Sequence, residues 1–119
     1  MADNPLRVVV RLSVRSGQGE AFKKLVAELS ASVEAEEPRM RSYEWYLSDD
    51  GADCYVTELL ADSDAFMAHL AHVGQSLGPL LEIAPISELV VLGSPSAPAK
   101  EAIAGLGPRF FRPLAGFAR

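Results

Sequence analysis

Cysteine, long apolar runs and signal segments are what this chain has least of. Cys54 is the single cysteine, which excludes a disulfide framework, and because it lies in a predicted strand we expect a buried, inert thiol. No apolar run approaches the roughly 18 residues of a membrane-spanning helix, and no secretory segment is recognisable. We therefore expect a cytoplasmic protein with no membrane partner.

Positive charge is absent from a long central region. Residues 42–99 contain no lysine or arginine but nine acids, and the whole chain has a net charge of −5. Because an acidic body repels phosphate backbones, we expect no nucleic-acid partner. The last twenty residues are basic and suit an acidic surface on the same or a neighbouring subunit; they contain Lys100, Arg109, Arg112 and Arg119.

The chain has enough apolar residues for one well-packed domain, since 49% of its 119 residues are hydrophobic. Residues 7–15 are β-prone and alternate, which places Val8, Val10, Leu12 and Val14 on one face of a strand. A helix is predicted from Glu20, because residues 22–33 carry an apolar stripe at helical spacing. Acids up to Pro38 end this helix, and we expect its end to fray because carboxylates there oppose the helix dipole.

The middle of the chain predicts a hairpin followed by a second helix. Strands over residues 43–47 and 54–59 flank an acidic turn with an Asp-Gly pair, a strong hairpin signal. Asp62 and Ser63 then open a helix that we expect to end at Gly74, with a further helical turn or two over residues 75–83. Residues 86–92 predict the last strand.

This order, β-α-β-β-α-β, predicts a ferredoxin-like α+β fold with an antiparallel four-stranded sheet and helices on one face. The other face is too apolar for bulk solvent, because residues 89–92 are apolar on both sides of their strand. A second copy, packed sheet against sheet, is the simplest cover. We therefore expect a homodimer, with a domain over residues 1–93 and a C-terminal extension over residues 94–119.

The C-terminal extension carries exposed-looking aromatic residues. A short helix is expected over residues 99–106, and Phe110, Phe111, Leu114 and Phe117 follow it. Left in water, these side chains would promote aggregation. We expect an arm docked on the dimer partner, with packing on the chain's own body as the alternative.

With this order of elements, the chain resembles the antibiotic biosynthesis monooxygenase-like proteins, which are small dimeric α/β-barrel proteins. The resemblance covers roughly residues 6–93. It rests on the strand Tyr43-Glu44-Trp45-Tyr46, on Glu58 near the end of the next strand, and on Asp62-x-x-Ala65-Phe66-x-x-His69-Leu70.

The resemblance implies an oxygenase without flavin, haem or metal, acting on quinol-like or phenolic polycyclic molecules. The electron-rich anion of the substrate supplies electrons to molecular oxygen, so the protein binds, deprotonates and excludes water. Other branches degrade haem with an asparagine, a tryptophan and a histidine. Here the first strand has no asparagine and the only tryptophan, Trp45, lies in the second, so haem degradation is not expected.

His69 and Glu58 are the candidate catalytic residues. His69 lies in the apolar stripe of its helix, where its imidazole can act as a base or be a core histidine satisfied by Glu58. Glu58 lies on a mostly apolar strand, so it needs a partner such as His69 or Arg11. His72 is expected at the solvated edge of the stripe. The His69-x-x-His72 pair lacks an obvious third ligand, so no metal site is expected.

Aromatic residues are the candidate substrate wall. Trp45 and Tyr43 share a strand face that suits a flat aromatic ligand or an ordinary core, and Phe66 lies beside them in the family pattern. Tyr55 faces opposite to Glu58 and suits either a cavity or a dimer interface. Arg11 either steadies a substrate anion or lies at that interface.

Two other classes of function use the same scaffold. The first is a non-redox isomerase or cyclase that works by enolisation with the same base. The second is a non-enzymatic dimeric binding or stress-response protein. No nucleophile motif and no phosphate-binding glycine loop is present.

Overall fold

The computed structural model describes residues 4–119. The elements follow the order β1 (Leu6–Ser13), α1 (Gly19–Glu36), β2 (Met40–Leu47), β3 (Asp53–Leu60), α2 (Ser63–Ile83), β4 (Ile86–Leu92), α3 (Ala97–Ile103), a 3-10 turn (Ala104–Leu106) and β5 (Arg109–Phe111). The first six of these are the predicted β-α-β-β-α-β order, so the ferredoxin-like prediction is confirmed.

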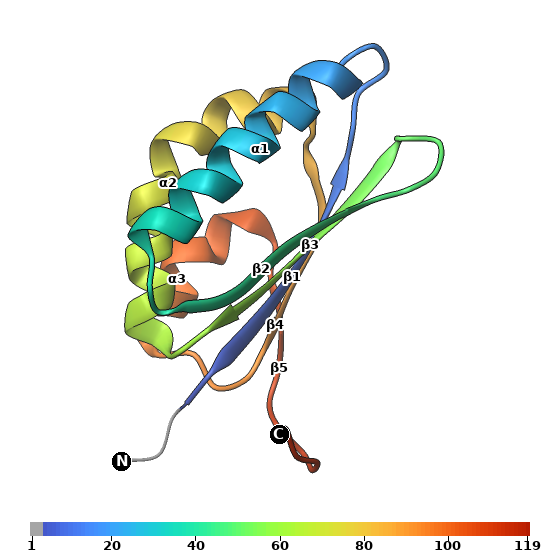
Figure 1. Cartoon of the computed structure of the whole chain (residues 1–119). Helices are drawn as coiled ribbons and strands as arrows, with labels where there is room; N and C mark the ends of the chain where they lie inside the picture. Colours follow the sequence, from blue (N-terminus) through green and yellow to red (C-terminus); the bar gives the residue numbers. More distant parts are fainter. Residues whose placement is uncertain (1–3) are drawn as a thin grey trace.

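The helices cover one face of a single open sheet (Figure 1). The strand order is β2-β3-β1-β4-β5, in which the first four strands pair antiparallel and β5 pairs parallel with β4. The fifth strand was not predicted. The sheet does not close on itself, and β2 forms its far edge. Among residues 4–119, no helix is both long and apolar enough to span a membrane.

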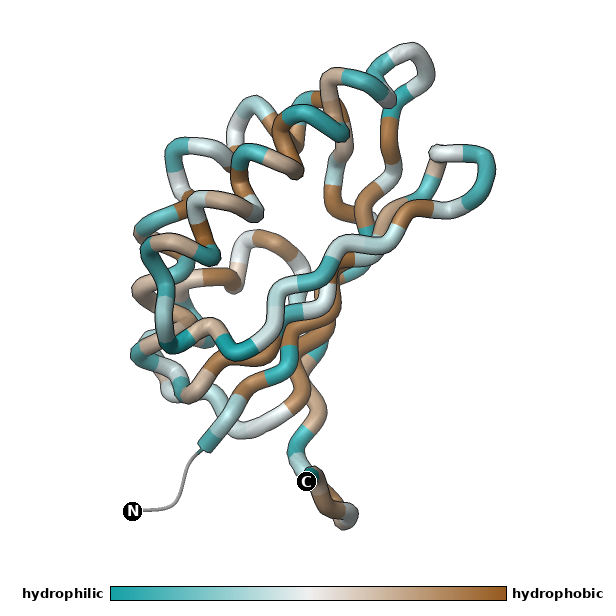
Figure 2. The backbone as a smooth tube through the Cα atoms, in the orientation of Figure 1, coloured by the Kyte–Doolittle hydropathy of each residue, from teal (hydrophilic) through white to brown (hydrophobic). Residues whose placement is uncertain are grey.

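The core lies between the sheet and the helices, where apolar segments of both layers face each other (Figure 2). Alternate residues of β1 point into this layer, so Val8 and Leu12 are buried whereas Arg7 is exposed. In β3 the inward residues are Cys54, Val56, Glu58 and Leu60. Cys54 is buried as predicted, and burial raises the pKa of its thiol to about 11.

Helix α2 is longer than the sequence indicated. Asp62 caps its first turn by accepting a hydrogen bond from the Ala65 amide at 2.9 Å. The expected end at Gly74 is wrong, because the helix continues to Ile83 with Pro79 inside it. The apolar side chains of Leu77 and Leu80 continue the stripe of Val73 onto the sheet, and this packing outweighs the poor helix propensity of glycine and proline.

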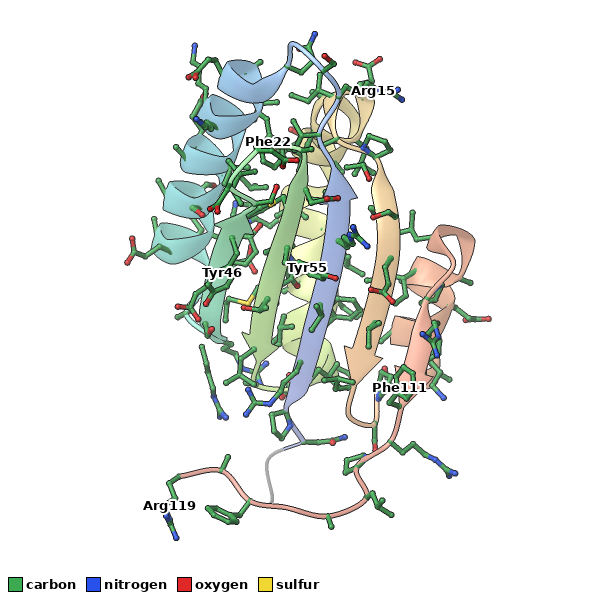
Figure 3. All side chains as sticks on the ribbon, turned by 90° about the vertical axis from the view of Figure 1, so that its right-hand side faces the viewer. Arg15, Phe22, Tyr46, Tyr55, Phe111 and Arg119 are labelled. Carbon is green, nitrogen blue, oxygen red and sulfur yellow. The ribbon has the colours of Figure 1, made fainter. Side chains whose placement is uncertain are left out.

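The outer face of the sheet and the C-terminal segment are exposed in the single chain (Figure 3). Tyr46, Tyr55 and Phe111 lie on or beside this face, and each is more than a third exposed. After β5 the chain extends away from its own body, so Leu114 is 98% and Phe117 81% exposed. Residues 112–119 therefore have little cover from their own chain, whereas the first part of the extension packs on it, with Ala99 and Ile103 buried and β5 paired with β4.

Candidate active site

A cavity of about 80 Å³ lies between the sheet and the helix layer. Its wall is mostly aliphatic with three aromatic rings, and it comes from every strand of the antiparallel sheet and from α1, α2 and α3. Its polar side chains are Glu58, His69, Tyr43 and Trp45. A dry, apolar cavity with a few converging polar groups is the usual form of a small-molecule site.

His69 is the centre of the polar groups. The stripe that buries Phe66 and Val73 also turns His69 inward, and only 4% of this residue is exposed. Its Nδ1 lies 2.8 Å and 3.0 Å from the two carboxylate oxygens of Glu37. Its Nε2 lies 3.7 Å from Oε1 of Glu58. The imidazole is thus held between two buried carboxylates.

These carboxylates decide the protonation of His69. Burial alone lowers the pKa of an imidazole, because the charged form loses its hydration. Glu58 and, less strongly, Glu37 stabilise the imidazolium, and their combined effect raises the pKa of His69 above its usual value. The structure therefore brings Glu58 and His69 together as an ion pair, with Nε2 and Oε1 3.7 Å apart, which is longer than a hydrogen bond.

Glu37 was missed by the sequence prediction. The end of α1 was expected to fray. Instead Glu37 is the C-cap of that helix, and its amide donates a hydrogen bond to the carbonyl of Val33 at 2.9 Å. Its side chain is only 8% exposed. The signal was present in the spacing, since Glu37 follows the buried Val33 by four residues and so lies on the same helix face.

His72 is also more constrained than the expected solvated position. Its side chain is 24% exposed, and its Nδ1 lies 2.5 Å from Oε2 of Glu37. Its Nε2 lies 3.0 Å from Oε2 of Glu36 and 2.9 Å from the Ser32 hydroxyl. Hydrogen bonding to Glu37 is the main reason why the pKa of His72 is raised. The correction has a simple cause, because the acids at the end of α1 reach across to α2.

The aromatic wall lies where it was predicted. Tyr43 and Trp45 share the inner face of β2 and meet edge to face, with ring centroids 5.6 Å apart. The Tyr43 ring also meets the His69 ring edge to face at 5.5 Å. Burial, and then the charges of Glu58 and Glu37, raise the pKa of the Tyr43 phenol far above its usual value, so Tyr43 stays protonated. Phe66, only 2% exposed, completes the wall.

Arg11 and Tyr55 are not part of this cavity. They pair across β1 and β3 on the outer face of the sheet, where the guanidinium lies 5.9 Å from the centre of the Tyr55 ring. Arg11 also forms an ion pair with Asp53 at 3.2 Å. The expectation that Arg11 partners Glu58 is wrong, because odd-numbered residues of β1 point away from the helices.

The acids and histidines around His69 do not form a metal centre. Within residues 4–119 no group of three or more histidine, cysteine, aspartate or glutamate side chains is arranged to hold a metal ion. What the arrangement offers is proton transfer. His69 lies within hydrogen-bond distance of Glu37 at Nδ1, and Glu58 lies 3.7 Å from Nε2 on the cavity side.

Fold and site together define a small ferredoxin-like α+β protein with a buried histidine–glutamate cluster beside an apolar cavity. Residues 5–75 match the family described as Antibiotic biosynthesis monooxygenase. The chain belongs to this family. No curated protein matches the chain in sequence at a significant level.

Solved structures share the fold at low sequence identity. MupZ from Pseudomonas fluorescens is 19% identical with a TM-score of 0.88, over 98% of this chain and 95% of that one. Rv0793 from Mycobacterium tuberculosis is 23% identical with a TM-score of 0.67, over 77% and 96%. A single-residue mutant of SnoaB, a cofactor-independent oxygenase from Streptomyces nogalater, is 20% identical with a TM-score of 0.65, over 79% and 96%.

Proposed function

We propose that this protein is a cofactor-independent monooxygenase that uses molecular oxygen on a quinol-like or phenolic polycyclic molecule. The observation that carries the proposal is the buried His69, held between Glu58 and Glu37 beside an apolar, aromatic-walled cavity. The family match supports the reaction class. So does the fold shared with SnoaB, which is described as a cofactor-independent oxygenase.

The protein's part in this reaction is acid–base and electrostatic. Glu37 holds Nδ1 of His69 and stabilises the imidazolium, so Nε2 is the stronger base toward the cavity. Removal of a phenolic proton by the His69–Glu58 pair leaves an electron-rich anion. At an activated CH2 group the carbon loses two hydrogens and gains one oxygen as a carbonyl. The second oxygen leaves as water with those two hydrogens, so the substrate supplies every electron that O2 accepts.

A polycyclic substrate requires the cavity to open. Ligand pockets are usually about 300–1,000 Å³, whereas this cavity measures about 80 Å³. We place the opening at the C-terminal half of α2, where Leu77, Leu80 and Leu81 line the cavity. Pro79 has no amide hydrogen, so the helix lacks one backbone hydrogen bond there and separates from the sheet more easily.

The oxygenase proposal is tested by oxygen uptake with purified, cofactor-free protein and a panel of hydroquinones, naphthols and anthrones. We expect uptake above the uncatalysed rate, reduced roughly 10²- to 10⁴-fold in His69→Ala, the range that a positioned acid or base contributes. Met67→Ala, on the exposed side of the same helix, is the matched control. Equal uptake by wild type and His69→Ala would contradict the proposed site.

A non-redox isomerase or cyclase is the second candidate, and the raised pKa of His69, which favours the imidazolium, supports it. An imidazolium beside the Glu58 carboxylate can donate a proton at one substrate atom while the carboxylate removes one at another. Under argon, such an enzyme exchanges the α-hydrogen of a ketone substrate with deuterated water, whereas the oxygenase needs O2 for turnover. Oxygen-independent turnover that is lost in His69→Ala would replace the first candidate with this one.

The homodimer belongs to the same proposal. We propose that the outer sheet face packs on a second copy, and that residues 112–119 lie on that copy, because Leu114 and Phe117 have no cover in their own chain. Burying a phenylalanine or leucine contributes about 1.5–3 kcal/mol. Deletion of residues 112–119 should therefore raise the dimer dissociation constant at least about tenfold in analytical ultracentrifugation. An unchanged constant would contradict the arm, and a wild-type monomer would contradict the dimer.

A further inference from the structure

A continuous line of acids and imidazoles runs from the cavity to the protein surface. Glu58 faces His69 at 3.7 Å, and Glu37 bridges the two histidines with distances of 2.8 Å to His69 Nδ1 and 2.5 Å to His72 Nδ1. His72 then meets Glu36 at 3.0 Å. Side-chain exposure along the line rises from 5% at His69 to 8%, 24% and 66% at Glu37, His72 and Glu36.

Each member of this line has the chemistry that a proton relay needs. An imidazole can accept a proton at one ring nitrogen and donate another from the opposite nitrogen. Each ring nitrogen of His69 and of His72 faces a glutamate carboxylate, which can accept a proton. The Glu37 carboxylate joins the two histidines, because both of its oxygens contact His69 Nδ1 and Oε2 also contacts His72 Nδ1.

We propose that Glu37, His72 and Glu36 form a relay that carries protons between the His69–Glu58 pair and solvent. The assignment of that pair as the acid–base centre rests on the proposed function. A proton taken from the substrate passes from His69 Nδ1 to Glu37, from Glu37 to His72 Nδ1, and from His72 Nε2 to Glu36 or water. The His69–Glu58 pair thus exchanges protons with solvent through side chains, by a path separate from the apolar cavity. His72 and Glu36 act through His69 and do not touch the substrate.

The groups around this line leave it with a net negative charge, and its outer end is connected to solvent. Besides its two carboxylates, His69 faces the protonated Tyr43, and His72 also faces the Ser32 hydroxyl. A surface hollow of about 180 Å³ is lined by Glu36, Glu37, His72 and Arg39. Arg39 is paired with Asp62, which takes up its charge. The hollow gives the outer end of the relay direct access to water.

A purely structural role would not need this path. Acids at a helix C-terminus oppose the dipole and cost helix stability, yet two consecutive acids lie at the end of α1. A buried His69 is already satisfied by Glu37 and Glu58. The further contact from Glu37 to His72 adds nothing to the burial of His69, but it extends the line to the surface.

The relay can be tested without a substrate. In full-length protein with ¹⁵N-labelled histidine, NMR measures how fast the His69 ring N–H exchanges with water. We expect His72→Gln, whose amide can still hydrogen-bond but cannot relay a proton, to slow this exchange at least about tenfold under conditions in which the variant is fully folded. Glu34→Gln, an exposed acid on α1, is the control and should leave the rate unchanged. Unchanged exchange in His72→Gln would overturn the relay.

Turnover provides the second readout and separates this proposal from the proposed function. With an active substrate, His72→Gln should lower kcat about tenfold or more without changing KM, and added imidazole buffer should restore it, because a small base replaces the missing shuttle. Full kcat without imidazole would overturn the relay and leave the oxygenase proposal intact. Slowed His69 exchange in a protein without oxygen uptake would support the relay and count against the oxygenase.

Discussion

The two faces of the same sheet place their charged side chains in different environments. On the inner face, Glu58 is 8% exposed and meets a buried imidazole. On the outer face, Arg11 and Asp53 form an ion pair at 3.2 Å with side chains 43% and 42% exposed. Strand β3 supplies a member of both pairs, and the alternation of its side chains decides which one faces the core.

The difference shows that burial, more than distance, decides what a charge pair contributes. Water screens the outer pair, and exposed pairs contribute about 0–1 kcal/mol. The inner groups have lost their hydration, so each depends on its partners, and removing one partner leaves an uncompensated charge. Loss of hydration lowers the pKa of His69, and the carboxylates of Glu58 and Glu37 reverse this effect, so the pKa is raised overall.

The largest effect is expected from the apolar wall of the inner face. Phe66→Ala removes a ring that is only 2% exposed, and such substitutions cost about 3–5 kcal/mol of unfolding free energy. The neighbouring Met67, 36% exposed on the same helix, is the matched control, and Met67→Ala should cost less than about 1 kcal/mol. Urea unfolding measures both. Similar losses in the two variants would mean that the cavity wall is not part of the core.

Glu37→Gln tests the charge of the inner face. Hydrogen bonds to charged groups contribute about 1.5–3 kcal/mol, and we expect a loss of this size near pH 6. Because His69 and His72 have raised folded-state pKa values, their stabilisation is complete below the unfolded value of about 6.5 and is lost as pH rises through the folded values. Urea unfolding from pH 5.5 to 8.5 should show this decline in the wild type.

The variant should show a flatter dependence, since a glutamine side chain at this position would carry no charge to hold the imidazolium ions. Glu34→Gln is the matched control, because it removes an acid from the same helix without touching either histidine, and should keep the wild-type slope. A slope that is as steep in Glu37→Gln as in the wild type would show that Glu37 does not raise these pKa values.

The smallest effect is expected on the outer face. Arg11→Ala removes the pair with Asp53, and in the monomer it should cost about 0–1 kcal/mol, less at high salt. In a dimer that covers this face, the same substitution acts on a buried pair and should cost more. Unfolding measured below and above the dimer dissociation constant distinguishes the two cases. Equal costs at both concentrations would place Arg11 outside the interface.

The sequence was a good guide to the fold wherever a simple period applies. Alternation over residues 7–15 predicted which side chains of β1 are buried, and the fourth strand has the bounds that were expected, Ile86–Leu92. The end of α2 was predicted wrongly. Local glycine and proline signals suggested an end at Gly74, but the tertiary packing of Leu77 and Leu80 stabilises a longer helix. The three-residue β5 is held by its parallel pairing with β4, which no local signal predicts.

The candidate site was predicted in part, for the same physical reason. Five of the predicted residues line the cavity, because each lies on the side of its strand or helix that faces the core. They are His69, Glu58, Tyr43, Trp45 and Phe66. Glu37 was missed because a helix end has no periodic partner after it, and its contacts with α2 depend on how two helices pack. Arg11 and Tyr55 were predicted as substrate-binding residues from the chemistry of their side chains, although the alternation along their strands places both on the outer face.

Cys54 makes the opening of this protein directly observable. The thiol is 1% exposed, and it lies under the same α2 side chains, Val73 and Leu80, that line the cavity. A thiol-reactive dye can reach it only while the helix layer stands away from the sheet, so the labelling rate reports how often that occurs. A ligand that holds the layers apart would speed labelling, and one that seals them would slow it. The single cysteine is thus a native reporter for ligand screening, with no engineered label.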